Sequence, residues 1–484
     1  MKIKNILLIL AIALGSSACS DWFDVSPKTN VKTDDLFKDE TGFQSALTGC
    51  YVKMTSDETY GKNLSWYFLE KLVQRYDDTE GNLAGNPDND PENRLRNPNV
   101  YNYTDNKYSK GIITEIWNAM YNNIANVNRL LSYLESNGKN VIKTPGAFEL
   151  MKGEALALRA YQHFDLLRMY GPIYKENPEM KCIPYRTQFA AEKSPLLSAS
   201  QILDLIIADL NEAETYLSED PMDWGMVAND PFKSYRGHRM NKYAAKALLA
   251  RVYLYRGSSE DLRKAGELAI DVIENCGLKL VRSNYQDITM FDETLFGLNM
   301  SKMKDRVQNY FSETFTNTGI ALRISNMNGS ELFEGNTGAG INDIRYKNNY
   351  GFISNINGMM TRKYLPTSDT KYAEKIPLIR LSEMYLIAAE ATGNVAYLND
   401  LRNARGISAN YDRKEVTTEY LSSEYCKEYF AEGQYFYYVK RNGLNDFYRC
   451  PAKLQGKMSS FQYVFPLPDD EKEYNYMEEN EIKK

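Results

Sequence analysis

The spacing of apolar residues constrains the fold of this chain more than any other feature of its sequence. In residues 111–136, GIITEIWNAMYNNIANVNRLLSYLES, large apolar side chains recur three and four positions apart, which places them on one face of a helix. Gly138 then supplies a helix stop signal. Because a wide apolar face has to be covered by other elements, the pattern predicts a packed α-helical body.

The same spacing recurs along the chain and predicts pairs of antiparallel helices. Further helices are expected at 147–170, 199–217, 239–257, about 262–276, within 378–405 and at about 422–440. Helix pairs joined by short turns are tetratricopeptide-like, although the regular 34-residue signature is absent. The expected fold class is therefore mainly α, with tetratricopeptide-like helix pairs and a large irregular, loop-rich ligand-binding region.

Two segments lack the helical spacing. Residues 77–110 and 280–375 contain many Gly and Asn residues and only short β-like runs. Loops of this length within a packed domain usually carry function. No low-complexity linker divides the chain, so we expect a single body at 19–484. Its helical frame covers about 36–276 and 376–440, and the irregular insertions cover about 77–110 and 280–375.

Residues 1–18 have the features of an export signal. Lys2 and Lys4 precede an apolar run at 6–14 that is too short to span a bilayer, and small residues lead to Cys19. The stretch is similar to a bacterial lipobox, in which the cysteine is diacylglycerylated and becomes the new N-terminus. We predict lipidation of Cys19 and a membrane tie through lipid alone. Plain secretion with an unmodified cysteine is the alternative.

Charge and cysteine content exclude some classes of protein. The net charge is −6 at pH 7, and it becomes −8 once Lys2 and Lys4 leave with the signal. An acidic surface of mixed sign offers no basic patch for nucleic acid, so we expect no nucleic-acid partner. The five later cysteines form no CxxC pair, and buried free thiols are expected. A Cys426–Cys450 bridge is the alternative.

Signatures of catalysis are absent from the sequence. His163 and His238 are its only histidines, and GxSxG, HExxH, Walker A and Rossmann motifs do not occur. His163 falls within a packed helix, so we interpret it as a core histidine with satisfied hydrogen bonds. No cofactor and no metal site is expected. The segment at 86–93, NPDNDPEN, lacks the glycine and glutamate of an EF-hand and is interpreted as a surface turn.

Several glutamates lie in helices that are otherwise apolar. We interpret them as structural carboxylates paired with arginines such as Arg380 or Arg441. These glutamates are Glu383, Glu390, Glu428 and Glu432. A secreted glycosidase with an unrecognised carboxylate pair remains an alternative, because 64 Asp and Glu residues are available.

Tyrosine is abundant, with 37 among 484 residues, and there are four tryptophans. Such rings combine an apolar face with a polar edge, which suits sugars and peptides. Most of the tyrosines have helical core spacing. The rings in irregular segments, beside Asp and Asn, are candidates for a binding platform. The candidate ligand-binding residues are Trp66, Asp77, Asp78, Tyr101, Tyr103, Trp224, Tyr310 and Tyr350.

Six segments in order along the chain resemble the SusD/RagB family of outer-membrane nutrient-binding lipoproteins. They are CSDWFDVSPKT (19–29), RAYQHFDLLRMYGPI (159–173), AAKALLARVYLYRG (244–257), IPLIRLSEMYLIAAEA with LNDLRNARG (376–391 and 398–406), EYFAEGQYFYYVKRNG (428–443) and FPLPDDEKEYN (465–475). These segments belong to the framework, and the resemblance therefore assigns no ligand-binding residue.

The resemblance implies a lipid-anchored protein exposed on the surface of the outer membrane. It implies capture of an oligosaccharide and delivery to a SusC-like TonB-dependent transporter, without a catalytic residue or cofactor. A peptide-binding member of the same family is an alternative. A tetratricopeptide scaffold without a small ligand is another alternative, of a different class.

Overall fold

The computed structural model describes most of the chain from residue 33 onward. The described residues are 33–77, 99–190, 194–228, 230, 232–283, 285–308, 310–311, 322–356, 358–365, 371–449 and 457–475. The predicted signal at 1–18, Cys19, Asp78, most of the 77–110 insertion and Cys450 lie outside these residues, as does the predicted turn at 86–93.

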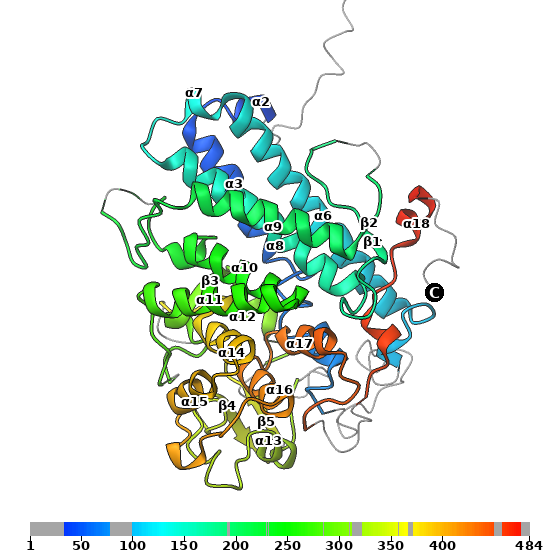
Figure 1. Cartoon of the computed structure of the whole chain (residues 1–484), viewed down its shortest axis with the longest axis vertical. Coiled ribbons are helices and arrows are strands. Elements are labelled where there is room, and N and C mark those ends of the chain that lie inside the picture. The colour runs from blue at the N-terminus through cyan, green and yellow to red at the C-terminus, as the bar shows by residue number, and fades with distance from the viewer. Residues whose placement is uncertain are drawn as a thin grey trace, which may run out of the picture.

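Long helices form the upper and middle parts of the molecule and continue into its lower part (Figure 1). They are α3 (Glu40–Met54), α6 (Lys107–Tyr133), α8 (Ala147–Tyr170), α9 (Ala199–Tyr216), α10 (Lys242–Arg256), α11 (Ser259–Asn275) and, in the lower part, α14 (Leu381–Thr392) and α15 (Val395–Ala404). Helix α8 packs against α6 and α9, α10 against α9 and α11, and α11 against α14. The predicted helix pairs and the mainly α fold are confirmed.

The helix ends follow from local side-chain chemistry. Asn106 caps α6 by accepting hydrogen bonds from the backbone amides of Tyr108 and Ser109. Ser198 and Ser258 form capping boxes at the starts of α9 and α11. Gly257 ends α10 with a φ of 76°, a conformation that favours glycine.

The predicted helix at 422–440 is two helices, α16 (Thr418–Glu428) and α17 (Gln434–Asn442). The chain breaks between them because Ala431 and Gly433 have φ values of 63° and 74°. A Cβ at Gly433 would lie 2.3 Å from the carbonyl oxygen of Leu64. This close approach requires glycine, so a tertiary contact sets the break.

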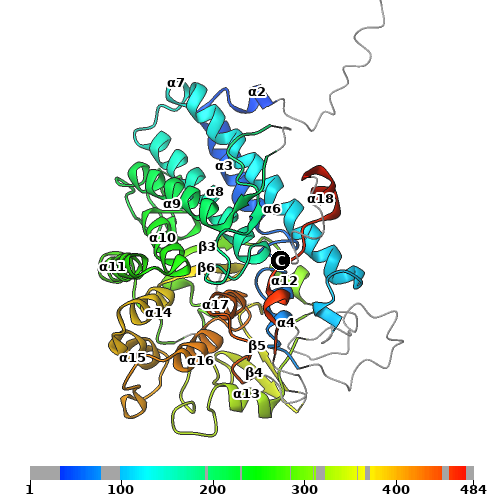
Figure 2. The same cartoon turned by 45° about the vertical axis from the view of Figure 1, so that its right-hand side comes forward.

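Short antiparallel strands connect distant parts of the chain. Strand β3 (Thr294–Asn299) pairs with β6 (Lys375–Arg380), β4 (Phe352–Asn355) with β5 (Gly358–Thr361), and β1 (Lys181–Ile183) with β2 (Leu197–Ser198). The β3–β6 pair brings together the two ends of the predicted 280–375 insertion. Figure 2 shows this pair beside α10, with β4, β5 and α13 at the opposite end of the molecule from α3 and α7.

Shorter helical segments complete the described structure. They are α2 (Thr33–Leu36), α4 (Phe68–Leu72), η1 (Asn99–Tyr101), η2 (Leu134–Gly138), α7 (Lys139–Val141), η3 (Arg236–His238), η4 (Phe291–Glu293), α12 (Met303–Val307), α13 (Asn326–Leu332), η5 (Ala409–Tyr411), η6 (Ser460–Tyr463) and α18 (Asp469–Asn475). Within the described ranges, every helix is too short or too polar to cross a bilayer.

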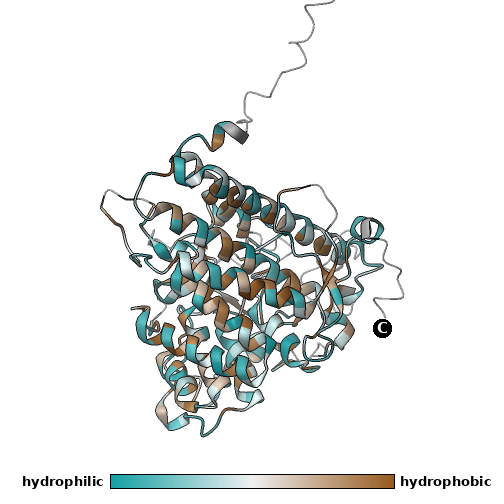
Figure 3. Ribbon diagram, turned by 45° about the horizontal axis from the view of Figure 1, so that its top comes forward, coloured by the Kyte–Doolittle hydropathy of each residue, from teal (hydrophilic) through white to brown (hydrophobic). Residues whose placement is uncertain are grey.

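A continuous hydrophobic cluster includes residues from the long helices and from the strands between them. Hydrophobic and hydrophilic residues alternate along the helices in Figure 3, as amphipathic packing requires. Cys50, Cys182, Cys276 and Cys426 are buried free thiols. Cys426 accepts a hydrogen bond from Nη1 of Arg75 at 2.7 Å. Because Cys450 lies outside the described residues, a Cys426–Cys450 bridge stays an alternative.

Buried ion pairs join the helices of the lower half. Arg380 and Arg405 each donate to Oε1 of Glu428 at 2.6 Å, and both also pair with Glu293. Burial by itself would raise the pKa of Glu428, but Arg405 and Arg380 hold this pKa well below its ordinary value. Since charges in the interior need partners, this network is a structural part of the fold.

Candidate functional site

The two irregular insertions meet at Asp77. The Asp77 backbone amide donates to the carbonyl oxygen of Arg323 at 2.9 Å. Its carboxylate accepts from the amide of Ser325 at 2.6 Å and from Nδ2 of Asn328 at 2.8 Å. Asp77 thus fastens the start of the 77–110 insertion to the N-terminus of α13. Asp77 therefore connects the two loops, and both of its carboxylate oxygens already accept hydrogen bonds.

Trp66 and Tyr310 come together in an aromatic cluster. Their ring centroids are 4.8 Å apart, and Tyr67, Phe311 and Tyr364 surround the indole. Trp66 is only 1% exposed, so it has no free face for a ligand in this structure. The expectation of an accessible Trp66 platform is therefore wrong: long-range packing places this ring in the core. Tyr310, at the edge of the cluster, is half-buried.

Tyr101 and Tyr103 also belong to the core rather than to an accessible platform. Both rings are 8% exposed. The Tyr101 hydroxyl donates to the carbonyl oxygen of Leu72 at 2.7 Å, and the Tyr103 hydroxyl donates to that of Gln462 at 2.8 Å. A buried tyrosine needs such a partner for its hydroxyl. These two residues attach η1 and the start of α6 to neighbouring segments.

Trp224 lies against the helical frame. Its indole N–H donates to the carbonyl oxygen of Cys276 at the end of α11, 3.0 Å away, and its ring packs beside Gly237. The side chain is half-buried. The structure thus assigns Trp224 to the frame and does not bring it to Trp66 or Tyr310.

Tyr350, which is half-buried, forms an aromatic pair with the exposed Tyr285, a residue that the sequence-based selection missed. The ring centroids are 5.6 Å apart with an interplanar angle of 58°, and Tyr285 is 57% exposed. Nη1 of Arg362 donates to the carbonyl oxygens of Tyr285 and Tyr350 at 3.3 and 3.2 Å. Arg362 therefore holds two loops together. We call Tyr285, Tyr350 and Arg362 the tyrosine platform.

The surroundings of the tyrosine platform suit an amphipathic ligand. The Arg362 guanidinium lies 5.6 Å from the ring centre of Tyr285, and Nζ of Lys347 lies 4.8 Å from that of Tyr350. The side chains of Asn348 and Asn349 are exposed beside them. This arrangement offers ring faces for stacking and amides and cations for hydrogen bonds. Tyr285 could have been found by the same signal as Tyr350, an aromatic ring in an irregular Asn-containing segment.

The side chain of His163, which was considered for a catalytic role, makes structural hydrogen bonds. His163 is buried, with Nδ1 2.9 Å from the carbonyl oxygen of Arg159 and Nε2 accepting from the amide of Arg186 at 3.0 Å. Burial lowers the pKa of His163 to about 3, so the ring stays neutral. The interpretation as a satisfied core histidine is confirmed.

The helical glutamates are paired with arginines, as predicted from the sequence. Glu383 pairs with Arg251 at 2.6 Å, and Glu390 with Arg441 at 2.8 Å. Glu428 and Glu432 both pair with Arg380. Within the part of the chain that the structure describes, no group of three or more His, Cys, Asp and Glu residues is placed to hold a metal ion.

Family models match both parts of the chain. A SusD-like model described as "Starch-binding associating with outer membrane" matches residues 21–254, and a "SusD family" model matches residues 297–483. The chain belongs to the SusD/RagB family. SusD-like protein P2 of Formosa agariphila is 26% identical over 282 residues, which are 57% of this chain and 46% of that protein. SusD-like protein P38 is 22% identical, and the match covers 50% of it. The match therefore spans about half the length of these curated relatives.

Solved structures share the fold of this SusD/RagB protein. A putative sugar binding protein from Bacteroides vulgatus is 22% identical, with a TM-score of 0.68 over 91% of this chain and 97% of that one. A chain crystallised with a xylogluco-oligosaccharide is 16% identical, with a TM-score of 0.63 over 90% and 97%. A laminarin binding SusD-like protein is 20% identical, with a TM-score of 0.59 over 90% and 98%.

Proposed function

We propose that this chain binds an oligosaccharide at the cell surface and delivers it to a SusC-like TonB-dependent transporter of the outer membrane, to which lipidated Cys19 tethers it. The observation that carries the proposal is the pair of exposed Tyr285 and half-buried Tyr350 in a chain of the SusD/RagB family. The starch-binding description of the family model and the saccharide ligands named for two solved relatives support it.

The tyrosine platform explains how such a ligand is held. The apolar face of a sugar ring stacks on an aromatic ring, while the hydroxyl groups need donors and acceptors around it. The Arg362 guanidinium bonds to the backbone carbonyl oxygens of Tyr285 and Tyr350. These bonds hold the two backbone segments that carry the rings in place before a ligand binds. Preorganisation of this kind lowers the entropic cost of binding.

Binding without turnover fits the state of the carboxylates. Glycoside hydrolysis requires two carboxyl groups that face the scissile bond, one of them able to donate a proton. The glutamates considered for such a role are engaged in ion pairs with arginines. We propose that the protein captures its ligand and breaks no bond in it.

The proposal is tested with the soluble fragment 20–484 and a panel of malto-, laminari- and xylogluco-oligosaccharides, measured by isothermal titration calorimetry. Tyr285→Ala and Tyr350→Ala should each weaken binding about tenfold, since an aromatic contact contributes about 0.5–1.5 kcal/mol beyond its buried area. Tyr411→Ala is the matched control, because Tyr411 is also exposed, at 42%, but lies in η5. Unchanged affinity in both platform variants, or release of shorter sugars by the wild type, would contradict the proposal.

A further inference from the structure

A cavity lies in the helical frame among α6, α8 and α9. Figures 1 and 2 show these helices in the part of the molecule opposite the β4–β5 hairpin that follows Tyr350. The volume of the cavity is about 570 Å³, within the range of about 300–1,000 Å³ that is usual for small-molecule sites. Helices α6, α8 and α9 and the segment 187–189 line it. We call it the frame cavity.

A buried polar network fixes one wall of the frame cavity. Nδ2 of Asn128 donates to the carbonyl oxygen of Arg186 at 2.9 Å. Nη1 of Arg159 donates to Oδ1 of Asn128 at 3.1 Å and to the carbonyl oxygen of Thr187 at 3.3 Å. The amide of Arg186 donates to His163. These bonds hold the 186–188 segment in one place and so position the next residue, Phe189.

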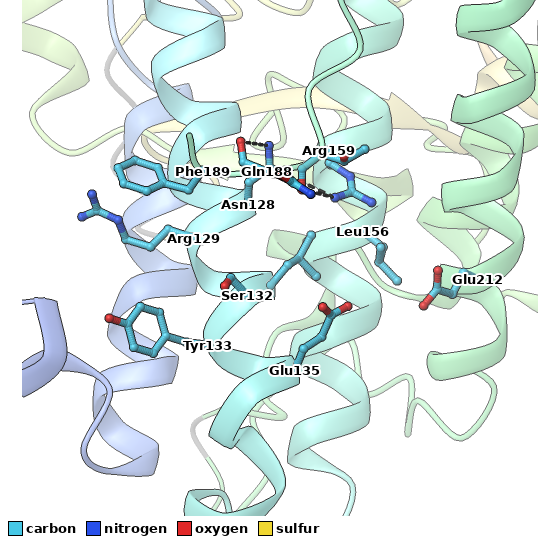
Figure 4. A pocket seen from close by; sticks show the side chains of 12 residues that line it. Asn128, Arg129, Ser132, Tyr133, Glu135, Leu156, Arg159, Gln188, Phe189 and Glu212 are labelled. Atoms are coloured by element: carbon cyan, nitrogen blue, oxygen red, sulfur yellow. Dashed lines mark hydrogen bonds between the residues drawn. The ribbon is translucent and has the colours of Figure 1, made fainter. Parts of the chain in front are cut away.

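Phe189 is an aromatic ring placed at the rim of the cavity. It is 50% exposed, and the guanidinium of Arg129 lies 3.8 Å from its ring centre. Figure 4 shows Phe189 and Arg129 at the left, Glu135 and Glu212 to the right, and Ser132 between these two groups. A large apolar ring held at a cavity rim by a rigid wall offers a stacking surface to a ligand.

The charges around the frame cavity compensate one another. Arg159 makes a bidentate pair with Asp209, with both distances 2.7 Å. Nζ of Lys152 lies between Glu135 and Glu212, at 3.6 and 3.5 Å. No single sign of charge therefore dominates the lining, which favours an uncharged ligand. The Ser132 hydroxyl and the Glu135 and Glu212 carboxylates can exchange hydrogen bonds with hydroxyl groups.

From this geometry we propose that the frame cavity is a second carbohydrate site, which takes a short uncharged segment of a saccharide chain. The sugar ring stacks on Phe189, and its hydroxyl groups bond to Ser132, Gln188, Glu135 and Glu212. The site is separate from the tyrosine platform, and it extends the proposed function because it gives the protein two contacts with one long glycan or with two shorter ones. Two linked contacts raise the overall affinity for a chain that spans both.

Two variants at exposed positions test this site without touching the core. Ser132→Trp places a large side chain into the cavity, and Phe189→Ala removes the stacking ring. Phe461→Ala is the matched control, because Phe461 is 75% exposed in η6, outside the cavity. The probes are maltohexaose, laminarihexaose and a xyloglucan oligosaccharide. The readouts are crystals soaked with each probe and the binding stoichiometry in solution.

At least one probe is expected against Phe189 in wild-type crystals. In solution, binding of this probe in the frame cavity should be lost in Ser132→Trp and weakened about tenfold in Phe189→Ala. It should be retained in Phe461→Ala and in a Tyr285→Ala, Tyr350→Ala double variant. Probe bound in the cavity of the double variant would support this inference even where the platform fails. Probe bound only at the platform, an unchanged stoichiometry in Ser132→Trp, or no bound probe anywhere would each overturn it.

Discussion

The backbone amide of Gly433 donates a hydrogen bond to Oε1 of Glu70 across 2.8 Å in the interior of the protein. Glu70 is fully buried, and burial raises its pKa to about 7, against backbone hydrogen bonds and Arg75, which lower it. The folded chain therefore keeps a proton on Glu70 at pH values at which the unfolded chain has lost it. The residue that precedes α17, Gly433, thus also contacts a titrating group.

The contribution of Glu70 to the free energy of unfolding should fall as the pH rises from about 4.3 to about 7. In this range Glu70 ionises in the unfolded state but stays protonated in the folded state, so the unfolded state gains stability. Above pH 7 this contribution stays constant. A shift of this size corresponds to roughly 4 kcal/mol. Glu70→Gln keeps an acceptor for Gly433 and should flatten this part of the profile in urea denaturation at several pH values. A variant profile identical to that of the wild type would show that another group is responsible.

The helical frame could be predicted because its signals are local. Helix α8 begins at Ala147 and ends at Tyr170, as expected, since the apolar spacing and the Gly171-Pro172 break both lie within the segment. The break between α16 and α17 was missed for the opposite reason. It depends on Gly433 approaching Leu64, and no residue near 433 in sequence carries that information.

The candidate site was harder to predict, because the exposure of a side chain depends on how distant segments of the chain pack against it. Trp66 and Tyr350 both occur in irregular sequence, but Trp66 is buried by Tyr310 and Tyr364, which are far away along the chain. Tyr350 stays half-buried and pairs with the exposed ring of Tyr285. Composition identified the type of residue, and only the packing distinguished core rings from accessible ones.

Glu428 should be among the most sensitive positions for stability. Glu428→Gln leaves the guanidinium groups of Arg380 and Arg405 short of a buried counter-charge, which typically costs about 3–5 kcal/mol. The matched control is Glu260→Gln. Glu260 pairs with Arg263 on the surface, where solvent screens the two charges and the pair contributes little to stability. Urea denaturation of both variants gives the comparison. Equal losses would show that the buried network adds nothing beyond a surface pair.

Cys19 should decide the attachment of the protein to membrane. Cys19→Ala removes the predicted acceptor of the lipid, and the protein should then appear in the soluble fraction of cells. Ser20→Ala, one residue along, is the control and should remain with the membrane. Fractionation followed by mass spectrometry of the N-terminal peptide makes the measurement. Membrane retention of the Cys19→Ala protein would contradict lipid anchoring at this position.

Arg362 should matter for affinity more than for folding. It is half-buried, lies outside the hydrophobic core and bonds to the carbonyl oxygens of Tyr285 and Tyr350, so Arg362→Gln frees the two loops without opening the core. Loss of preorganisation should weaken oligosaccharide binding about tenfold, or roughly 1.4 kcal/mol, while the melting temperature changes little. Lys347→Gln is the control. It removes a neighbouring cation that lies over Tyr350, and a smaller loss is expected. A larger effect of Lys347→Gln would mean that charge, rather than the positions of the rings, governs binding.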